Sequence, residues 1–173
     1  MNVAEKLKVI EAEVLKGRPI EELLKSFSWK EFEDFCAHVF EINGFQVLRN
    51  FRFKSRNKRF EVDIVAVRGA LILCADCKRW GFKTGSFSSL AEAVEKQAER
   101  AQALSQRVAE LYKLIKLKNA KEISIIPILI SLHEKSMKIY DGIPIVPIFK
   151  LNNFLNEFDV YVGDLKVIKA SLS

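Results

Sequence analysis

The chain has 173 residues, of which 49% are hydrophobic and 29% are charged, a balance that is typical of a globular protein and excludes a disordered or collagen-like chain. The longest apolar run, residues 123–132, is about half as long as the ~20 residues of a membrane-spanning helix, so we expect a soluble, cytoplasmic protein without a membrane partner. The net charge is +6, but residues 1–41 carry −3, so the positive charge lies in the rest of the chain and favours a polyanionic partner.

The first part of the chain has the apolar spacing of helices. Two helices are predicted within residues 1–27, which we interpret as an N-terminal helical extension of a domain formed by residues 28–173. Ser28 and Glu31 have the spacing of a capping box, which predicts that a third helix begins there. This helix is expected to end near Gly44.

The pattern then changes to that of strands. Alternating and apolar stretches predict three consecutive strands over residues 45–53, 59–67 and 70–78. Apolar residues at helical spacing predict one long helix over residues 90–116. The continuous apolar run 123–130 predicts a strand that is buried on both faces.

The remainder of the chain gives weaker patterns. Pro127 interrupts the apolar strand, so we expect a bulge or an edge position there. Another strand is predicted over residues 144–148, a short helix over 151–155, and extended pieces over 160–168. The order of elements predicts an α/β fold in which a mixed β-sheet is flanked by helices.

Two aspartates and a lysine interrupt the second and third predicted strands. Asp76 and Lys78 are two residues apart in a strand, so they project from the same face. A tight turn at Gly69 would bring Asp63, in the preceding strand, alongside them. A charge without a partner in an apolar strand is costly, which favours a functional role, and a structural ion pair is the alternative.

This trio suits divalent-metal chemistry. Mg²⁺ prefers oxygen ligands and takes one or two protein carboxylates, so two aspartates from adjacent strands could bind it. The bound ion would acidify a water molecule and neutralise charge on a phosphodiester. A lysine beside the metal could orient that water or stabilise the developing charge.

The order of these motifs resembles the PD-(D/E)xK, or restriction-endonuclease-like, superfamily of nucleases. The closest likeness is to Mrr-like restriction endonucleases and archaeal Holliday-junction resolvases. The resemblance covers residues 29–104 and is carried by the segments WKEFEDF, EVDIVA and ADCK. It implies a restriction-endonuclease-like core and Mg²⁺ (or Mn²⁺) as cofactor. Two positions depart from the pattern: Val62 replaces the motif proline, and Asp76 stands where glutamate is usual.

The resemblance also implies roles for individual residues. Two aspartates and a peptide carbonyl correspond to the metal ligands, the lysine is catalytic, and a helix glutamate assists the metal site. Similar proteins carry a glutamine in the helix after the lysine strand, and the segment KQAER supplies a candidate. The implied catalytic residues are Glu33, Asp63, Asp76, Lys78 and Gln97, and the implied metal ligands are Asp63, Asp76 and the Cys77 carbonyl.

A dense cluster of cations lies between the first two predicted strands. Residues 49–59 contain six Lys and Arg residues and no acidic residue. A solvated hairpin tip is the alternative, but mutual repulsion of so many cations favours contact with phosphates. The expected DNA-binding residues are Arg49, Arg52, Lys54, Arg56, Lys58 and Arg59, with Arg79 beyond the third strand.

Other features do not change this interpretation. Cys74 and Cys77 have the spacing of half a zinc site, but the sequence offers no second pair, so buried and inert thiols are expected. We therefore expect a metal-dependent DNA endonuclease of restriction or repair type that hydrolyses phosphodiester bonds. Two alternatives stay open: a Holliday-junction resolvase, which would act as a homodimer, and a non-cleaving nucleic-acid-binding module that retains the nuclease fold.

Overall fold

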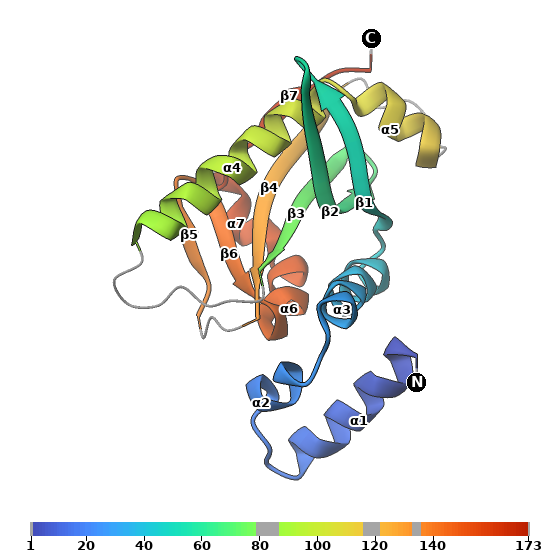
Figure 1. The fold of residues 1–173 in the computed structure, drawn as a ribbon, viewed down its shortest axis with the longest axis vertical. Coiled ribbons are helices and arrows are strands. Elements are labelled where there is room, and N and C mark those ends of the chain that lie inside the picture. The colour runs from blue at the N-terminus through green and yellow to red at the C-terminus, as the bar shows by residue number, and fades with distance from the viewer. Residues whose placement is uncertain (1, 79–86, 116–121, 133–135, 173) are drawn as a thin grey trace.

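The computed structural model describes residues 2–78, 87–115, 122–132 and 136–172 (Figure 1). It contains a mixed sheet of seven strands in the order β1-β2-β3-β4-β6-β5, with β7 paired to β4. The neighbours β1, β2 and β3 are antiparallel, whereas β3, β4 and β6 run parallel. The strands are β1 (Gln46–Ser55), β2 (Lys58–Arg68), β3 (Leu71–Lys78), β4 (Ile123–Ser131), β5 (Lys138–Tyr140), β6 (Ile143–Pro147) and β7 (Ile168–Ala170).

Helices pack on both faces of this sheet, so the predicted α/β fold with a mixed sheet is confirmed. The helices are α1 (Val3–Leu15), α2 (Ile20–Lys25), α3 (Trp29–Ile42), α4 (Phe87–Ser105), α5 (Val108–Ile115), α6 (Leu151–Asn156) and α7 (Phe158–Tyr161). In Figure 1, α4 crosses one face of the sheet, while α1 and α2 lie at the lower end of the molecule beyond α3. No helix in the described part of the chain has the length and apolar character needed to cross a membrane.

The local signals that start and end the first helices are present. Ser28 caps α3 by accepting a hydrogen bond from the Glu31 N–H, and the Glu31 carboxylate accepts one from the Ser28 N–H. This reciprocal arrangement satisfies two N–H groups that a helix end would otherwise leave without partners. Gly44 follows α3 with a φ of 82°, a left-handed conformation that glycine adopts without steric cost.

The predicted helix over residues 90–116 is wrong in one respect, because it is two helices. The break falls after Ser105, where α4 ends and a turn leads into α5. The Ser105 hydroxyl donates to the Gln102 carbonyl at 2.6 Å, a local bond that competes with the helical pattern and bends helices.

Two further expectations are also corrected. Residues 160–164 are helical rather than extended, because Phe158 and Tyr161 both pack their rings on Phe154 at helical spacing, whereas Leu165 is extended and Ile168 begins β7. Pro127 lies in the interior of the sheet and pairs with Cys74 of β3. On its other side, β4 passes from β7 to β6 at this point, so the missing N–H of proline is not needed by either neighbour.

The sheet separates the core into two main hydrophobic clusters, one on each face. One cluster lies between the sheet and α3 and α6, and includes Leu73, Ala75 and Cys77 of β3. The other lies beneath α4 and α5 and includes Ile72 and Cys74. Alternation along β3 therefore puts Asp76 and Lys78 on the side of α4, and it puts the two cysteines, both buried and free, on opposite faces as predicted.

Candidate active site

An ion-pair network forms at the C-terminal end of β3. The Asp76 carboxylate is only 4% exposed. Its Oδ2 lies 2.7 Å from the Lys78 Nζ, although this contact lacks the geometry of a hydrogen bond. Its Oδ1 lies 3.2 Å from a guanidinium nitrogen of Arg100 on α4. The predicted convergence of Asp76 and Lys78 is therefore present, and one arginine from the facing helix joins it.

Asp63 approaches this network from β2. The backbone pairing of β2 with β3 runs from Arg68 to Ile64, and the next contact comes from a side chain: the Cys77 N–H donates to Asp63 Oδ2 at 2.8 Å. Burial, together with the neighbouring charge of Asp76, raises the pKa of Asp63 to about 7. Two carboxylates thus lie together in one partly buried place, and among the described residues only Asp76 has cations in contact with it.

Gln97 lies behind this network rather than in contact with the aspartates. Its side chain is fully buried, and Nε2 donates to the Cys74 carbonyl at 2.7 Å. Its Oε1 accepts a hydrogen bond from Arg100 at 3.2 Å. Gln97 therefore holds the guanidinium that pairs with Asp76. Arg100 was absent from the predicted site, although its position one helical turn after Gln97 is the signal that points to it.

Glu33 lies on the other side of the sheet, on α3. Its side chain is buried, and burial raises its pKa, while a hydrogen bond from Trp29 and the positive charge of Arg49 act in the opposite direction. The charge of Glu33 contributes to the raised pKa of Asp63, which places the two carboxylates within electrostatic reach. Among the described residues, however, no hydrogen bond or ion pair joins Glu33 to Asp63 or Asp76.

The donor atoms fit a hard divalent cation with few protein ligands. The described residues contain no group of three or more His, Cys, Asp or Glu side chains placed to bind a metal. Mg²⁺, however, takes only one or two carboxylates and keeps waters elsewhere. Asp63 and Asp76 offer two carboxylates whose mutual repulsion such an ion would relieve, and the buried Asp76 Oδ2 accepts no hydrogen bond from any described residue. Lys78 and Arg100 already neutralise part of this charge, so a cation at Asp76 competes with them.

The cationic hairpin, formed by β1 and β2, is partly neutralised by acids from elsewhere in the chain. Three of its predicted DNA-binding cations form ion pairs: Arg49 with Asp34, Arg52 with Glu61 at 3.0 Å, and Lys58 with Glu99 at 2.6 Å. Within the described residues, the remaining three, Lys54, Arg56 and Arg59, have no ion-pair partner. Arg79 lies outside the described residues.

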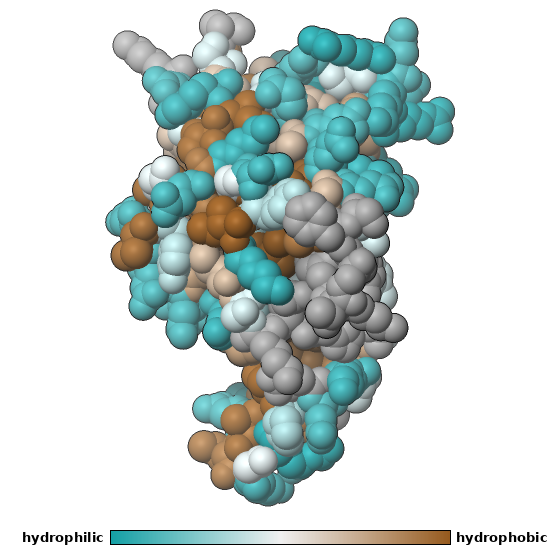
Figure 2. All heavy atoms as spheres, turned by 90° about the vertical axis from the view of Figure 1, so that its left-hand side faces the viewer, coloured by the Kyte–Doolittle hydropathy of each residue, from teal (hydrophilic) through white to brown (hydrophobic). Residues whose placement is uncertain are grey.

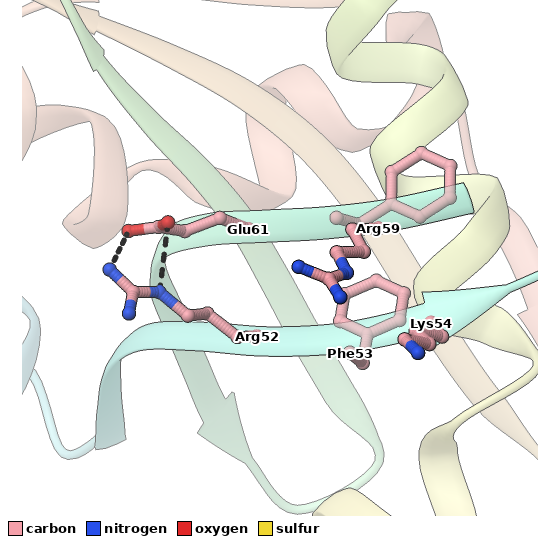
Figure 3. Close-up of a pocket in the computed structure, with 6 residues that line it drawn as sticks. Arg52, Phe53, Lys54, Arg59 and Glu61 are labelled. Carbon is pink, nitrogen blue, oxygen red and sulfur yellow. Dashed lines mark hydrogen bonds and ion pairs between the residues drawn. The ribbon is translucent and has the colours of Figure 1, made fainter.

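The hairpin carries a hollow lined by residues of both its strands (Figure 3). Its volume is about 580 Å³, and its lining comprises Arg52, Phe53, Lys54, Arg59, Phe60 and Glu61. Lys54 and Arg59 lie directly opposite each other in the strand register, and so do Arg52 and Glu61. The hollow therefore contains one compensated pair and one pair of like charges, and like charges in this position are destabilising.

The hairpin is fastened to the helices behind it. The Arg107 Nε donates to the Lys54 carbonyl at 2.8 Å, and the Ser55 hydroxyl donates to the Gln106 side chain at 2.7 Å. Gln106 and Arg107 both lie in the turn between α4 and α5. The break in the predicted long helix therefore supplies the contacts that hold the hairpin. The hairpin of β1 and β2, called the arm below, is thus supported by the turn between α4 and α5, and it carries the exposed cations.

Two similarities to known proteins bear on this site. Residues 24–129 match a family model of restriction endonucleases, that of the Mrr catalytic domain. The match spans α3, the three antiparallel strands, α4, α5 and most of β4, and so includes every residue of the β3 network. The chain is also 29% identical, over 136 residues, to an uncharacterised protein of Archaeoglobus fulgidus, and this alignment covers 79% of the chain and 95% of the relative.

Proposed function

The chain belongs to the restriction endonuclease family whose model it matches and is a nuclease of that type, and from this premise we propose that it is a Mg²⁺- or Mn²⁺-dependent DNA endonuclease of restriction or repair type. The observation that carries the proposal is the convergence of Asp63, Asp76 and Lys78 at the end of β3. Two carboxylates and an ammonium group, held together by partly buried contacts, suit hydrolysis of a phosphodiester.

Each residue of the network has a distinct role in this proposal. Asp63 and Asp76 would hold the divalent ion, which when bound supplies an acidified water and neutralises phosphate charge. Lys78, which is partly exposed beside Asp76, donates hydrogen bonds to the attacking water or to a phosphate oxygen as charge develops. Gln97 holds Arg100, and Arg100 keeps the Asp76 carboxylate in its orientation. Glu33 adds negative charge from the α3 side.

The hairpin would position the DNA. Lys54, Arg56 and Arg59 are exposed and have no ion pair within the described part of the chain, so they are available to contact phosphates. A phosphate between Lys54 and Arg59 would remove the repulsion between these two opposed cations. Such contacts orient the duplex without reading its sequence.

The proposal is tested by a cleavage panel on the purified full chain. Duplex, single-stranded, flapped and four-way-junction DNA are incubated with Mg²⁺, with Mn²⁺ and with excess EDTA. We expect cleavage with either metal and none in EDTA. Lys78→Ala should lower the rate by about 10²–10⁴-fold while DNA binding persists, because that group acts on the developing charge. Lys96→Ala, which removes an exposed cation from α4 that pairs with Glu92, is the matched control.

Three outcomes would contradict the proposal in different ways. Undiminished cleavage in EDTA would exclude the metal mechanism. DNA binding without cleavage in either metal would assign the chain as a binding module that retains the fold. Strong preference for the four-way junction, by a dimer in solution, would assign a resolvase.

A further inference from the structure

In each strand of the hairpin, the alternation of side chains between the two faces of the sheet reverses at one position, and this reversal is called the exchange of faces below. In an ordinary strand, residues two apart share a face. On β1, however, Leu48 and Phe51 pack against the same hydrophobic cluster beneath α4, although they are three residues apart. On β2, Val62 and Val65 also share that cluster at the same spacing. In both strands, therefore, the side chains on the two sides of this position do not follow one continuous alternation.

The exchange coincides with a single interruption of the strand pairing. The β1–β2 register is continuous from Gln46 to Ser55, both strands being fully described, except at Asn50. The flanking pairs are Arg49 with Ile64 and Phe51 with Val62, so Asn50 lies opposite Asp63. The residue that interrupts β1 is thus, by register, opposite the aspartate that the proposed function assigns to the metal.

Asn50 has a left-handed backbone. Its φ is 51°, a region that L-residues other than glycine, asparagine and aspartate rarely adopt. Its side chain is exposed and belongs to neither core cluster, so packing does not explain the conformation. Strained backbone of this kind persists only where the surrounding structure requires it.

The consequence of the exchange appears at Asp63. Just beyond it, Ile64 resumes regular pairing with Ala75 of β3, whereas Asp63 uses its carboxylate to accept the Cys77 N–H. Val62, before Asp63, and Val65, after it, both pack on the α4 side of the sheet. Asp63 lies between these two residues, where its side chain can turn toward β3.

We infer that Asn50 is the positioning residue for Asp63: its left-handed backbone creates the exchange of faces that directs the Asp63 carboxylate to the Cys77 amide and to Asp76. The catalytic consequence of this inference rests on the proposed function, but the structural part does not. Phe51 and Phe53 reach the cluster beneath α4 by the same exchange, which ties the hairpin arm to the site.

The test compares two asparagines that share a backbone conformation. Asn57, at the hairpin tip, has a φ of 62° and lies far along the strand from Asp63. Asn50→Ala and Asn57→Ala therefore introduce similar backbone strain at different places, and Asn50→Gly retains access to the left-handed region. The first readout is hydrogen exchange of the Cys77 amide in metal-free protein, measured below the melting temperature of each variant.

We expect Asn50→Ala to accelerate exchange of the Cys77 amide by about 5- to 30-fold, the equivalent of the left-handed penalty of one residue. Asn50→Gly and Asn57→Ala should leave it within a factor of two or so of the parent. The second readout is the Mg²⁺ concentration at the midpoint of thermal stabilisation, which should rise for Asn50→Ala alone.

Equal exchange of the Cys77 amide in Asn50→Ala and Asn57→Ala would overturn the inference, as would loss of its protection in Asn50→Gly. A parent protein without Mg²⁺-dependent stabilisation or cleavage would instead overturn the proposed function. In that event the amide comparison still decides the positioning role, since it requires neither metal nor DNA.

Discussion

The charged residues at the end of β3 and those on the arm of the hairpin differ in burial and in ion pairing. At the end of β3, Asp76 is buried and in contact with two cations of its own chain. On the arm, Lys54 and Arg59 are exposed, opposed to each other and without ion pairs among the described residues. The polar character of the upper end of the molecule, where the tip of the arm lies in Figure 1, is visible in Figure 2.

The difference follows from solvation. A buried charge without compensation is costly, so the chain supplies Lys78 and Arg100 to Asp76, whereas water tolerates the cations of the arm. The compensation is incomplete at one residue, Asp63, whose pKa is raised by burial and by Asp76. Among the described residues, Asp63 therefore has no cation in contact with it, and Lys54 and Arg59 have no anion. A divalent cation and a polyanion are the ligands that would supply these contacts.

The largest effect that separates the two regions is expected on stability. In metal-free protein above pH 7, Asp63→Asn should raise the free energy of unfolding by on the order of 2–4 kcal/mol, because it removes a charge that burial and the repulsion with Asp76 make costly. The asparagine oxygen can still accept the Cys77 N–H. Denaturant melts at several pH values measure the effect, and Asp159→Asn, on the exposed side of α7, is the control.

The pH dependence of this effect has a definite sign. The pKa of Asp63 is about 7 when folded and near its ordinary value of about 4 when unfolded, so the folded chain holds a proton that the unfolded chain has released. Stability of the parent therefore falls as pH rises from about 4 to about 7. The advantage of Asp63→Asn should vanish near pH 4, and an advantage that is equal at all pH values would contradict this account.

The arm is expected to show the reverse behaviour, with an effect on binding and not on stability. Replacing Lys54 and Arg59 together by Gln should flatten the slope of log K against log salt by about 0.9 for each lost phosphate contact on duplex DNA. The melting temperature should stay constant or rise slightly, because a like-charge pair is removed.

A matched control for this pair lies beside it in the same hollow. Arg52→Gln combined with Glu61→Gln removes an ion pair of 3.0 Å without changing the net charge. Its salt slope should equal that of the parent. If both double variants change the slope equally, the contribution of a cation to DNA binding depends on its position on the arm and does not depend on whether it has an ion pair.

Sequence alone predicted which charged residues of β2 and β3 converge, but not which cation of α4 pairs with them. Alternation within β3 was enough to put Asp76 and Lys78 on one face. Arg100 lies one helical turn after Gln97, a spacing that indicates it could face the site, but its contact with Asp76 depends on how α4 packs on β3 and could be known only from the fold. Gln97 was found by resemblance, yet its bond to a backbone carbonyl of β3 could be known only from the fold.

The hairpin illustrates the same limit. The density of cations over residues 49–59 was visible, but their partners Asp34, Glu61 and Glu99 lie in other elements, two of them far away in sequence. The exchange of faces at Asn50 was also invisible, because an asparagine inside an alternating strand carries no signal of its own backbone conformation. Tertiary pairing determined both features.

The smallest effect concerns competition for Asp76. Arg100 is partly exposed and pairs with Oδ1 of the buried Asp76, and because Lys78 still pairs with that carboxylate when Arg100 is lost, we expect the contact to contribute on the order of 1 kcal/mol. A divalent cation that binds Asp76 must overcome this contact, so Arg100→Gln should lower the Mg²⁺ midpoint of thermal stabilisation by roughly 1.5- to 5-fold. Lys96→Gln, an exposed change on the same helix, should leave the midpoint unchanged. A higher midpoint for Arg100→Gln would mean that the arginine orients Asp76 for the metal more than it competes with it, and the compensation at the end of β3 would then be part of the metal site itself.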